Sequence, residues 1–302
     1  VAHGRIEVDM IEFNGPDFEN VDNRILSLKL VEAGLTEAVM FDQNGRVEQP
    51  AETLYKKSCL IERGSLRPLT KVNVDMLEKA QAQFIKREDV DSNHVKVFME
   101  LTLSTLGSSE GEIDHADYLA RIDCINACGY DVLVSNLFEY YKLSAFLRRN
   151  VSNPIGLVMG LNNLADILKE EYYEKLEGGI LEALGILFKD NIKIYAYPIE
   201  NENFERYRKQ IGVGDNVEAD AAADGLIDID NLLVAENLRN LYKYVRENGF
   251  LEPILDCDRS NMGLFSRDIF EKVQGRQSGW EKLLPPCVAK LIEEKNLWRA
   301  TE

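Results

Sequence analysis

Histidine is scarce in this chain: the 302 residues contain three, His3, His94 and His115. No HExxH or other paired arrangement occurs, which argues against a zinc site built on histidine. The glycine-rich GxGxxG and Walker patterns that bind nucleotide phosphates are missing as well. There is also no GxSxG elbow and no Ser/His/Asp order. The sequence therefore contains no complete catalytic motif, predicts no metal site and names no cofactor.

Basic residues and long apolar runs are also lacking. Lys and Arg number 35 against 52 Asp and Glu, so the formal net charge is −17 and the pI is about 4.8. Nucleic acid and anionic membrane surfaces are not expected partners, because both bind through clustered Lys and Arg. No apolar run approaches the about 18 residues of a transmembrane helix, so no membrane insertion is predicted.

The cysteines are few and odd in number. Five are scattered along the chain, at positions 59, 124, 128, 257 and 287. This usage is typical of a reduced, intracellular protein, so the predicted location is the cytoplasm or an organelle interior.

What is present is an alternation of short apolar strands with helices. Strand-like segments recur along the first two thirds of the chain, at "IEVDMIEF", "EAVMFD", "SCLIE", "VKVFMELTL", "DVLVSN", "PIGLVMG" and "NIKIYAYPI". Helical segments of about 10 to 15 residues separate most of them, a pattern typical of βαβ units and a parallel sheet. We predict a Rossmann-like three-layer α/β domain over residues 1–200, an acidic surface excursion over 201–230, and a helical C-terminal extension over 231–302 packed on the same domain.

One strand end raises a specific question. "VMFDQNG" places Asp42 after an apolar run, where enzymes of the haloacid-dehalogenase-like fold carry an aspartate nucleophile. Those enzymes carry a second Asp two residues later, and here that position is Asn44, which cannot act as a general acid. Asn44-Gly45 between strand-like flanks is instead a strong hairpin signal. We therefore favour a turn at Asp42 over a catalytic carboxylate.

The segment "LIERGSLRP" is the best candidate for a binding site. A strand ends here, and Arg63, Ser65 and Arg67 follow around a glycine that lets the backbone approach a ligand. The two arginines suit a phosphate or carboxylate, and ligands of open α/β sheets bind beyond the carboxyl ends of the strands. The alternative is that these arginines neutralise nearby acidic side chains.

Three further positions are candidates at other strand ends. Ser135 and Asn136 follow "VLV", and Asn162 follows "GLVMG", where such residues cap a helix or offer its N-terminus to an anion. Glu100 lies within the buried strand "VFMELTL" and is the candidate acid/base, because a buried carboxylate needs a partner or has a raised pKa. The other reading of Glu100 is the polar position of a half-exposed strand.

Several segments together resemble a family of uncharacterised bacterial proteins. They include "RIEVDMIEFNGPDF", "QPAETLYKKSCLIERGSLRPLTKVNVDMLEKAQAQF", "GEIDHADYLARID", "LVSNLFEYYKLSAFLRR" and "LYKYVRENGFLEP", and the resemblance covers most of residues 5–270. Members are often labelled nicotinate- or nicotinamide-mononucleotide adenylyltransferase, which implies a nucleotide-like ligand. That class uses an HxGH-type motif near its first strand, and the contexts "HADY" and "NHVK" do not match it. The resemblance therefore assigns no catalytic residue.

Two functions remain open at this point. The first is binding, with or without turnover, of a nucleotide or phosphorylated small molecule at the carboxyl ends of the strands. The second is a non-catalytic subunit or scaffold, with a protein partner or further copies of itself. Convergence of Arg63, Arg67, Ser135 and Glu100 in an open pocket would favour the first, and their burial in ion pairs would favour the second.

Overall fold

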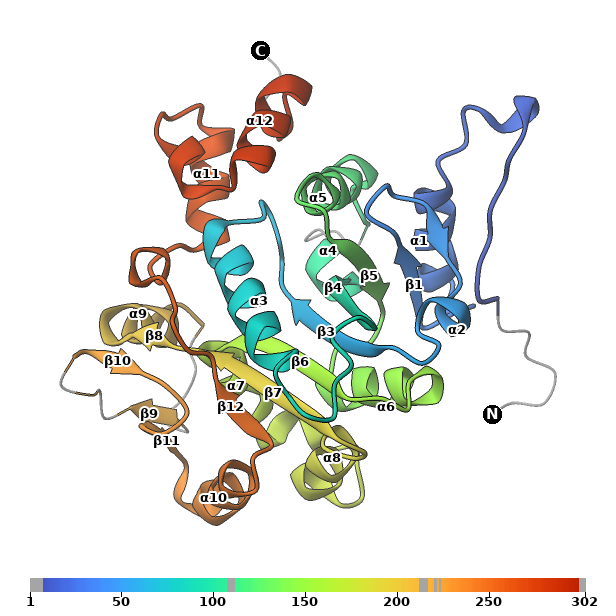
Figure 1. Cartoon of the computed structure of the whole chain (residues 1–302). Helices are drawn as coiled ribbons and strands as arrows, with labels where there is room; N and C mark the ends of the chain where they lie inside the picture. Colours follow the sequence, from blue (N-terminus) through green and yellow to red (C-terminus); the bar gives the residue numbers. More distant parts are fainter. Residues whose placement is uncertain (1–7, 108–111, 212–216, 220–221, 223, 299–302) are drawn as a thin grey trace.

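A single eight-stranded sheet forms the centre of the molecule (Figure 1). The structure is a computed structural model, and it describes residues 8–107, 112–211, 217–219, 222 and 224–298. The strand order is β12-β7-β6-β3-β4-β5-β1-β2. The strands of this sheet are β1 (Ala38–Phe41), β2 (Val47–Glu48), β3 (Ser58–Arg63), β4 (Val95–Thr102), β5 (Asp131–Ser135), β6 (Ile155–Gly160), β7 (Ile192–Tyr197) and β12 (Leu251–Pro253).

Six neighbouring strands, from β12 to β5, run parallel. The chain builds β3, β4 and β5 outward in one direction, then returns beside β3 and builds β6, β7 and β12 in the other. This is the doubly wound order of a Rossmann fold, and its switch point lies between β3 and β6. The mostly parallel sheet and the Rossmann-like class predicted from the sequence are both confirmed.

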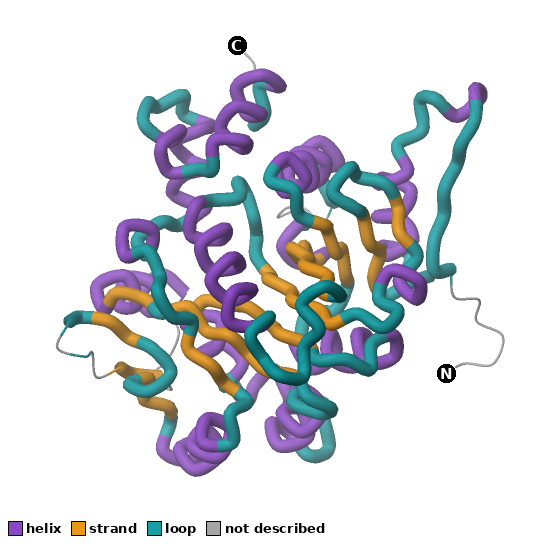
Figure 2. The backbone as a smooth tube through the Cα atoms, in the orientation of Figure 1, coloured by secondary structure: helices purple, strands orange, loops and turns teal. Residues whose placement is uncertain are grey.

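Helices cover both faces of the sheet and form the two outer layers of the three (Figures 1 and 2). The principal helices are α1 (Asn23–Glu32), α3 (Lys71–Phe84), α5 (His115–Ala127), α6 (Tyr140–Asn150), α7 (Leu161–Ile167), α8 (Gly179–Leu187), α9 (Asn201–Ile211), α10 (Arg239–Glu247), α11 (Ser266–Gln274) and α12 (Pro286–Lys295). Two single-turn helices, α2 (Pro50–Thr53) and α4 (Leu103–Leu106), complete the set. No helix among the described residues is long and apolar enough to cross a membrane.

The two faces of each strand bury side chains in separate cores. Ile61 of β3 belongs to the core under α6, α7 and α8, whereas Leu60 belongs to the core under α1, α3 and α5. Because side chains alternate along a strand, Glu62 follows Leu60 and Arg63 follows Ile61. The last two residues of β3 therefore point to opposite faces of the sheet.

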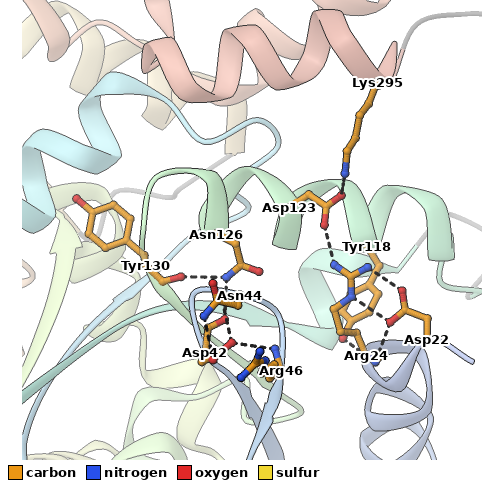
Figure 3. Close-up of polar contacts among 10 residues, drawn as sticks. All are labelled: Asp22, Arg24, Asp42, Asn44, Arg46, Tyr118, Asp123, Asn126, Tyr130 and Lys295. Carbon is orange, nitrogen blue, oxygen red and sulfur yellow. Dashed lines mark hydrogen bonds and ion pairs between the residues drawn. The ribbon is translucent and has the colours of Figure 1, made fainter. Parts of the chain in front are cut away.

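Asp42 occupies a hairpin turn, as we favoured from the sequence (Figure 3). Its Oδ1 accepts hydrogen bonds from the backbone N–H groups of Asn44, at 2.8 Å, and Arg46, at 2.9 Å. Burial works to raise the pKa of Asp42, but these donors outweigh it and leave that pKa below its usual value. β1 is antiparallel to β5 with Phe41 opposite Val132, so Asp42 lies at the amino edge of the parallel strands, away from the ligand-binding edge.

The N-terminal and C-terminal parts differ from the sequence prediction. We predicted a strand over 6–13, but residues 8–13 form no strand, and the first two positions lie outside the described residues. Helix α9 begins at Asn201, inside the predicted surface excursion. Directly before it, β8 (Ile199–Glu200) pairs with β10 (Leu226–Ile227), and after it β9 (Val217–Ala219) pairs with β11 (Leu232–Val234).

The predicted helical extension is not helical throughout. Leu232–Val234 form a strand, and β12 joins the edge of the main sheet beside β7. β12 pairs with β7 because the edge of the sheet offers unpaired backbone groups to an extended segment.

The last helix is tied to the body of the molecule by polar contacts and a disulfide. Lys295 of α12 donates to Asp123 of α5 at 2.6 Å, and Asp123 also accepts from Arg24 of α1 (Figure 3). Cys128 and Cys287 are disulfide-bonded, although 159 positions separate them in the sequence. The prediction of a fully reduced chain is therefore wrong for this pair, and the compartment stays a prediction.

Candidate functional site

Two cavities meet at the carboxyl edge of the sheet, at the β3–β6 switch point. Residues Arg63, Gly64, Ser65 and Asn163 line both of them. We call the cavity of about 400 Å³ the polar cavity; its lining includes Glu62, Asn73, Asn162, Tyr197, Tyr207 and Arg267. We call the cavity of about 200 Å³ the aromatic cavity; its lining includes Phe138, Tyr140, Tyr172 and Tyr173. Together they form the crevice in which ligands of doubly wound folds bind.

The polar cavity lies on the α3 side of the sheet and the aromatic cavity on the α6 side. Val72, Asn73 and Met76 bring the first turns of α3 to the polar cavity, and Phe265 and Arg267 bring the start of α11. Glu139 and Tyr140, at the start of α6, line the aromatic cavity together with Asp166 of α7. The end of β3 separates the two, so a ligand crossing the crevice would pass Gly64 and Ser65.

Arg63, Glu100 and Ser135 come together, but they bind one another. The Arg63 guanidinium donates from Nε to Oε2 of Glu100 at 2.8 Å and from Nη2 to Oε1 at 2.9 Å. Ser135 Oγ donates to Oε1 of Glu100 at 2.6 Å. Glu100 is 0% exposed and the Arg63 side chain is 8% exposed, so this is a buried, bidentate ion pair.

Further contacts fix the Arg63 guanidinium in place. Nη2 donates to the carbonyl oxygen of Leu137 at 2.7 Å, and Nη1 donates to that of Phe138. The guanidinium carbon lies 4.4 Å from the centre of the Tyr140 ring. Burial works to lower the pKa of Arg63, but the Glu100 charge outweighs it, and the pKa is raised. Arg63 therefore borders both cavities as a neutralised pair with Glu100, and its predicted role as an anion ligand stays a prediction.

Arg67 and Ser65 lie in different surroundings, although two positions separate them. Ser65 is exposed and lines both cavities. Arg67 turns towards α5, where its Nε donates to Asp117 at 2.6 Å, and its guanidinium covers the Phe270 ring at 4.1 Å. It does not line either cavity of the crevice. The alternative interpretation, in which the arginines pair with acidic side chains, describes both Arg63 and Arg67. Arg63, Arg67, Ser135 and Glu100 therefore do not converge in an open pocket, and the case for a ligand site rests on the two cavities beside them.

The structure also shows where the candidate helix-capping residues Ser135, Asn136 and Asn162 lie. Helix α6 begins at Tyr140 with Glu139 as its N-cap residue. Ser135 and Asn136 therefore do not cap it, although capping was one of the two roles that the sequence suggested for them. Four loop residues separate Ser135 from the helix, and Ser135 Oγ donates to Glu100 instead. Asn136 is exposed and lines neither cavity of the crevice. Asn162 lies in the first turn of α7 and lines the polar cavity, and its Oδ1 would be 2.5 Å from a Cβ at Gly160.

The residue that sequence reasoning missed is Glu62. Its side chain is 1% exposed and lines the polar cavity. Oε1 accepts a hydrogen bond from Asn73 Nδ2 at 2.8 Å, and no described residue makes a hydrogen bond with Oε2. Burial raises the pKa of Glu62 to about 8, and the Asn73 contact offsets only part of that rise. The argument applied to Glu100, a carboxylate in a buried strand, would have identified Glu62 as well.

The lining of the aromatic cavity combines aromatic rings with the carboxylate of Asp166. Phe138, 51% exposed, packs edge-on against Tyr172, with 5.7 Å between ring centres. Asp166 pairs with Lys169 at 2.7 Å and accepts from the Tyr207 hydroxyl at 2.8 Å. Burial raises the pKa of Tyr173 above its usual range. These rings and hydroxyl groups suit a planar ligand that carries a few hydrogen-bonding atoms.

No cluster of three or more His, Cys, Asp and Glu side chains suited to a metal ion occurs in the part of the chain that the structure describes. Cys59 and Cys124 are buried, and burial raises the pKa of each thiol to about 12. Neither is therefore a thiolate at neutral pH, which is the form that binds metals and attacks substrates.

Comparison with known proteins shows similarity in the fold alone. No protein-family profile matches the chain, and no curated protein sequence matches it. Two solved structures of Plasmodium falciparum nicotinic acid mononucleotide adenylyltransferase, complexed with APC and with NaAD, are similar with TM-scores of 0.42 and 0.43. Each is 11% identical in sequence, and the match covers 80% of this chain and 97% of the other. At this identity the likeness transfers no residue and no activity to the chain.

Proposed function

We propose that this chain binds a nucleotide or a phosphorylated small molecule in the crevice between β3 and β6. The observation that carries the proposal is the meeting of an aromatic cavity and a polar cavity at the switch point, joined across Gly64 and Ser65. A nucleotide has the same two parts, a planar base and a phosphorylated sugar. Ligand sites in α/β folds combine mostly apolar walls with a few placed polar groups, as here.

The planar part of the ligand belongs in the aromatic cavity. Phe138, Tyr140 and Tyr172 supply ring surface, and Asn163 supplies an amide for a ring substituent. The phosphorylated part belongs in the polar cavity, beside the first turn of α3. The N-terminal end of a helix attracts anions because the helix dipole is positive there.

Turnover of the ligand, if the chain catalyses a reaction, would rest on positioning and charge stabilisation. Glu62 supports an acid/base role better than Glu100 does, because its pKa of about 8 lies close to neutral pH and it faces the cavity. Glu100 is tied to Arg63 and Ser135 on the opposite face of the sheet.

Calorimetric titration with AMP tests the proposal. Binding to the wild-type chain is expected, and Phe138→Ala should weaken it about tenfold, because stacking on an aromatic ring contributes about 1–3 kcal/mol. Tyr55→Ala is the matched control: Tyr55 is 63% exposed and precedes β3, so it lies at the opposite edge of the sheet. Failure of both AMP and inorganic phosphate to bind the wild-type chain would rule out the proposed function.

A further inference from the structure

The last two residues of β3, Glu62 and Arg63, place their side chains on opposite faces of the sheet. Arg63 points to the α6 face and pairs with Glu100, its direct partner on β4. Glu62 points to the α3 face, where its direct partners are Met99 on β4 and Val158 on β6. Neither of these neighbours carries a charge or a hydrogen-bond donor that could stabilise a carboxylate.

The one hydrogen bond at Glu62 defines which oxygen carries the proton. Asn73 Nδ2 is a donor, and it contacts Oε1. A neutral carboxylic acid at this position therefore keeps its proton on Oε2, the oxygen for which no described residue is a partner. The result is a buried O–H donor for which the described part of the chain supplies no acceptor, at the wall of a cavity of about 400 Å³.

The charged and titratable groups that face this cavity do not supply the missing acceptor. On β7, the Tyr197 hydroxyl donates to Asp75, and on α9 the Tyr207 hydroxyl donates to Asp166; neither oxygen lies within hydrogen-bond distance of Glu62 Oε2. On α11, Arg267 is 80% exposed and lies 3.7 Å from Glu271.

The surroundings of Glu62 on other elements are equally uncharged. Tyr130, which precedes β5, is a neutral phenol at neutral pH, because burial raises its pKa to about 12. α3 itself contributes the uncharged Val72, Asn73 and Met76 to the cavity wall. Arg63 also borders the polar cavity, but its guanidinium is paired with Glu100 on the other face of the sheet.

We infer that Glu62 acts as an uncharged hydrogen-bond donor which, with the first turn of α3, receives a phosphoryl oxygen of the bound ligand. This inference rests on the proposed function and assigns the phosphorylated part of the ligand to one place. An isolated carboxylate is costly to bury, so the neutral form is favoured. A neutral donor and a helix N-terminus both attract an anionic oxygen, whereas an ionised Glu62 would repel it.

A proton-linked affinity follows from this arrangement. Because the pKa of Glu62 is about 8, the free protein holds the proton at neutral pH and loses it above that value. A bound anion raises the pKa further, so binding in alkaline solution must take up a proton. We expect the affinity to fall about tenfold for each pH unit above about 8.

The experiment measures AMP binding by calorimetry between about pH 7 and about pH 9.5, where the phosphate is a dianion throughout. The wild-type dissociation constant should rise more than tenfold over this range. Glu62→Gln keeps the shape, the Asn73 contact and a donor at the Oε2 position, but cannot ionise. The dissociation constant of this variant should therefore change less than about threefold between about pH 7 and about pH 9.5.

Each outcome decides a different point. A pH-independent wild-type affinity, or a Glu62→Gln chain that folds but no longer binds AMP, would overturn the inference, since the second result would mean that an ionised carboxylate is needed. Absence of AMP and inorganic phosphate binding at about pH 7 would instead overturn the proposed function. Infrared spectroscopy of the ligand-free chain gives an independent readout: the C=O band of a protonated carboxyl group should be present in the wild type and reduced in the variant.

Discussion

Replacing Glu62 with glutamine should stabilise the protein increasingly as the pH rises from acid to neutral. In the unfolded chain this carboxyl has an ordinary pKa of 4.5, whereas burial in the fold raises the pKa to about 8. Between those values the unfolded state releases a proton that the folded state retains. The protonation of Glu62 therefore lowers the free energy of unfolding progressively as the pH rises through this window. The loss reaches its full value above about pH 8, and there is none below about pH 4.5.

The magnitude follows from the two pKa values. Each pKa unit corresponds to about 1.4 kcal/mol, so the wild type loses about 1.4 kcal/mol by about pH 5.5 and about 3 kcal/mol by about pH 7. Glutamine has no proton to lose. The pH-independent effect of the substitution cancels when the two pH values are compared, and the advantage of the variant should grow by about 2 kcal/mol between them.

Urea unfolding at the two pH values measures this difference, with Glu100→Gln as the matched control. Glu100 is also a fully buried strand glutamate, but it is paired with Arg63. Removing its charge leaves a buried, uncompensated arginine, which should cost about 3–5 kcal/mol at about pH 7. An advantage of Glu62→Gln that is the same at both pH values would refute the conclusion that the folded protein holds Glu62 neutral.

Other substitutions test the packing, the covalent link and the crevice. Gly156→Ala places a Cβ 2.5 Å from Leu60 Cδ1, so thermal unfolding should show a loss of about 1–3 kcal/mol, whereas Gly185→Ala, where the space is open, should be neutral or stabilising. Alkylation of the non-reduced, unfolded chain should label three of its five cysteines, since Cys128 and Cys287 are bonded, and Cys128→Ser should reduce stability by about 2–4 kcal/mol only in the absence of reductant. Phe138→Ala should weaken AMP binding with little change in unfolding, because its ring is half exposed; a large loss of stability would mean that the ring is a core residue instead.

The local pattern of the sequence was sufficient for the sheet-forming strands and for one turn. Short apolar runs separated by amphipathic helices predicted β3 to β7 and their parallel pairing, because each βαβ unit must bury its strand on both faces. Asn44-Gly45 predicted the β1–β2 hairpin, because these residues adopt the backbone angles of a tight turn at little cost. The same local reasoning failed at β12, where pairing with the open edge of β7 decided the structure.

The sequence by itself determined the fold class, the acidic charge and the stretch around Arg63 as a candidate site. Only the tertiary structure decided which glutamate is held by a partner. Glu62 and Glu100 are both glutamates in buried strands, and their local sequences do not distinguish them. The pairing of β3 with β4 sets Arg63 beside Glu100 and Met99 beside Glu62. Because a shift of one residue moves a side chain to the other face of the sheet, this register alone places one carboxylate in an ion pair and leaves the other without a countercharge, facing the crevice.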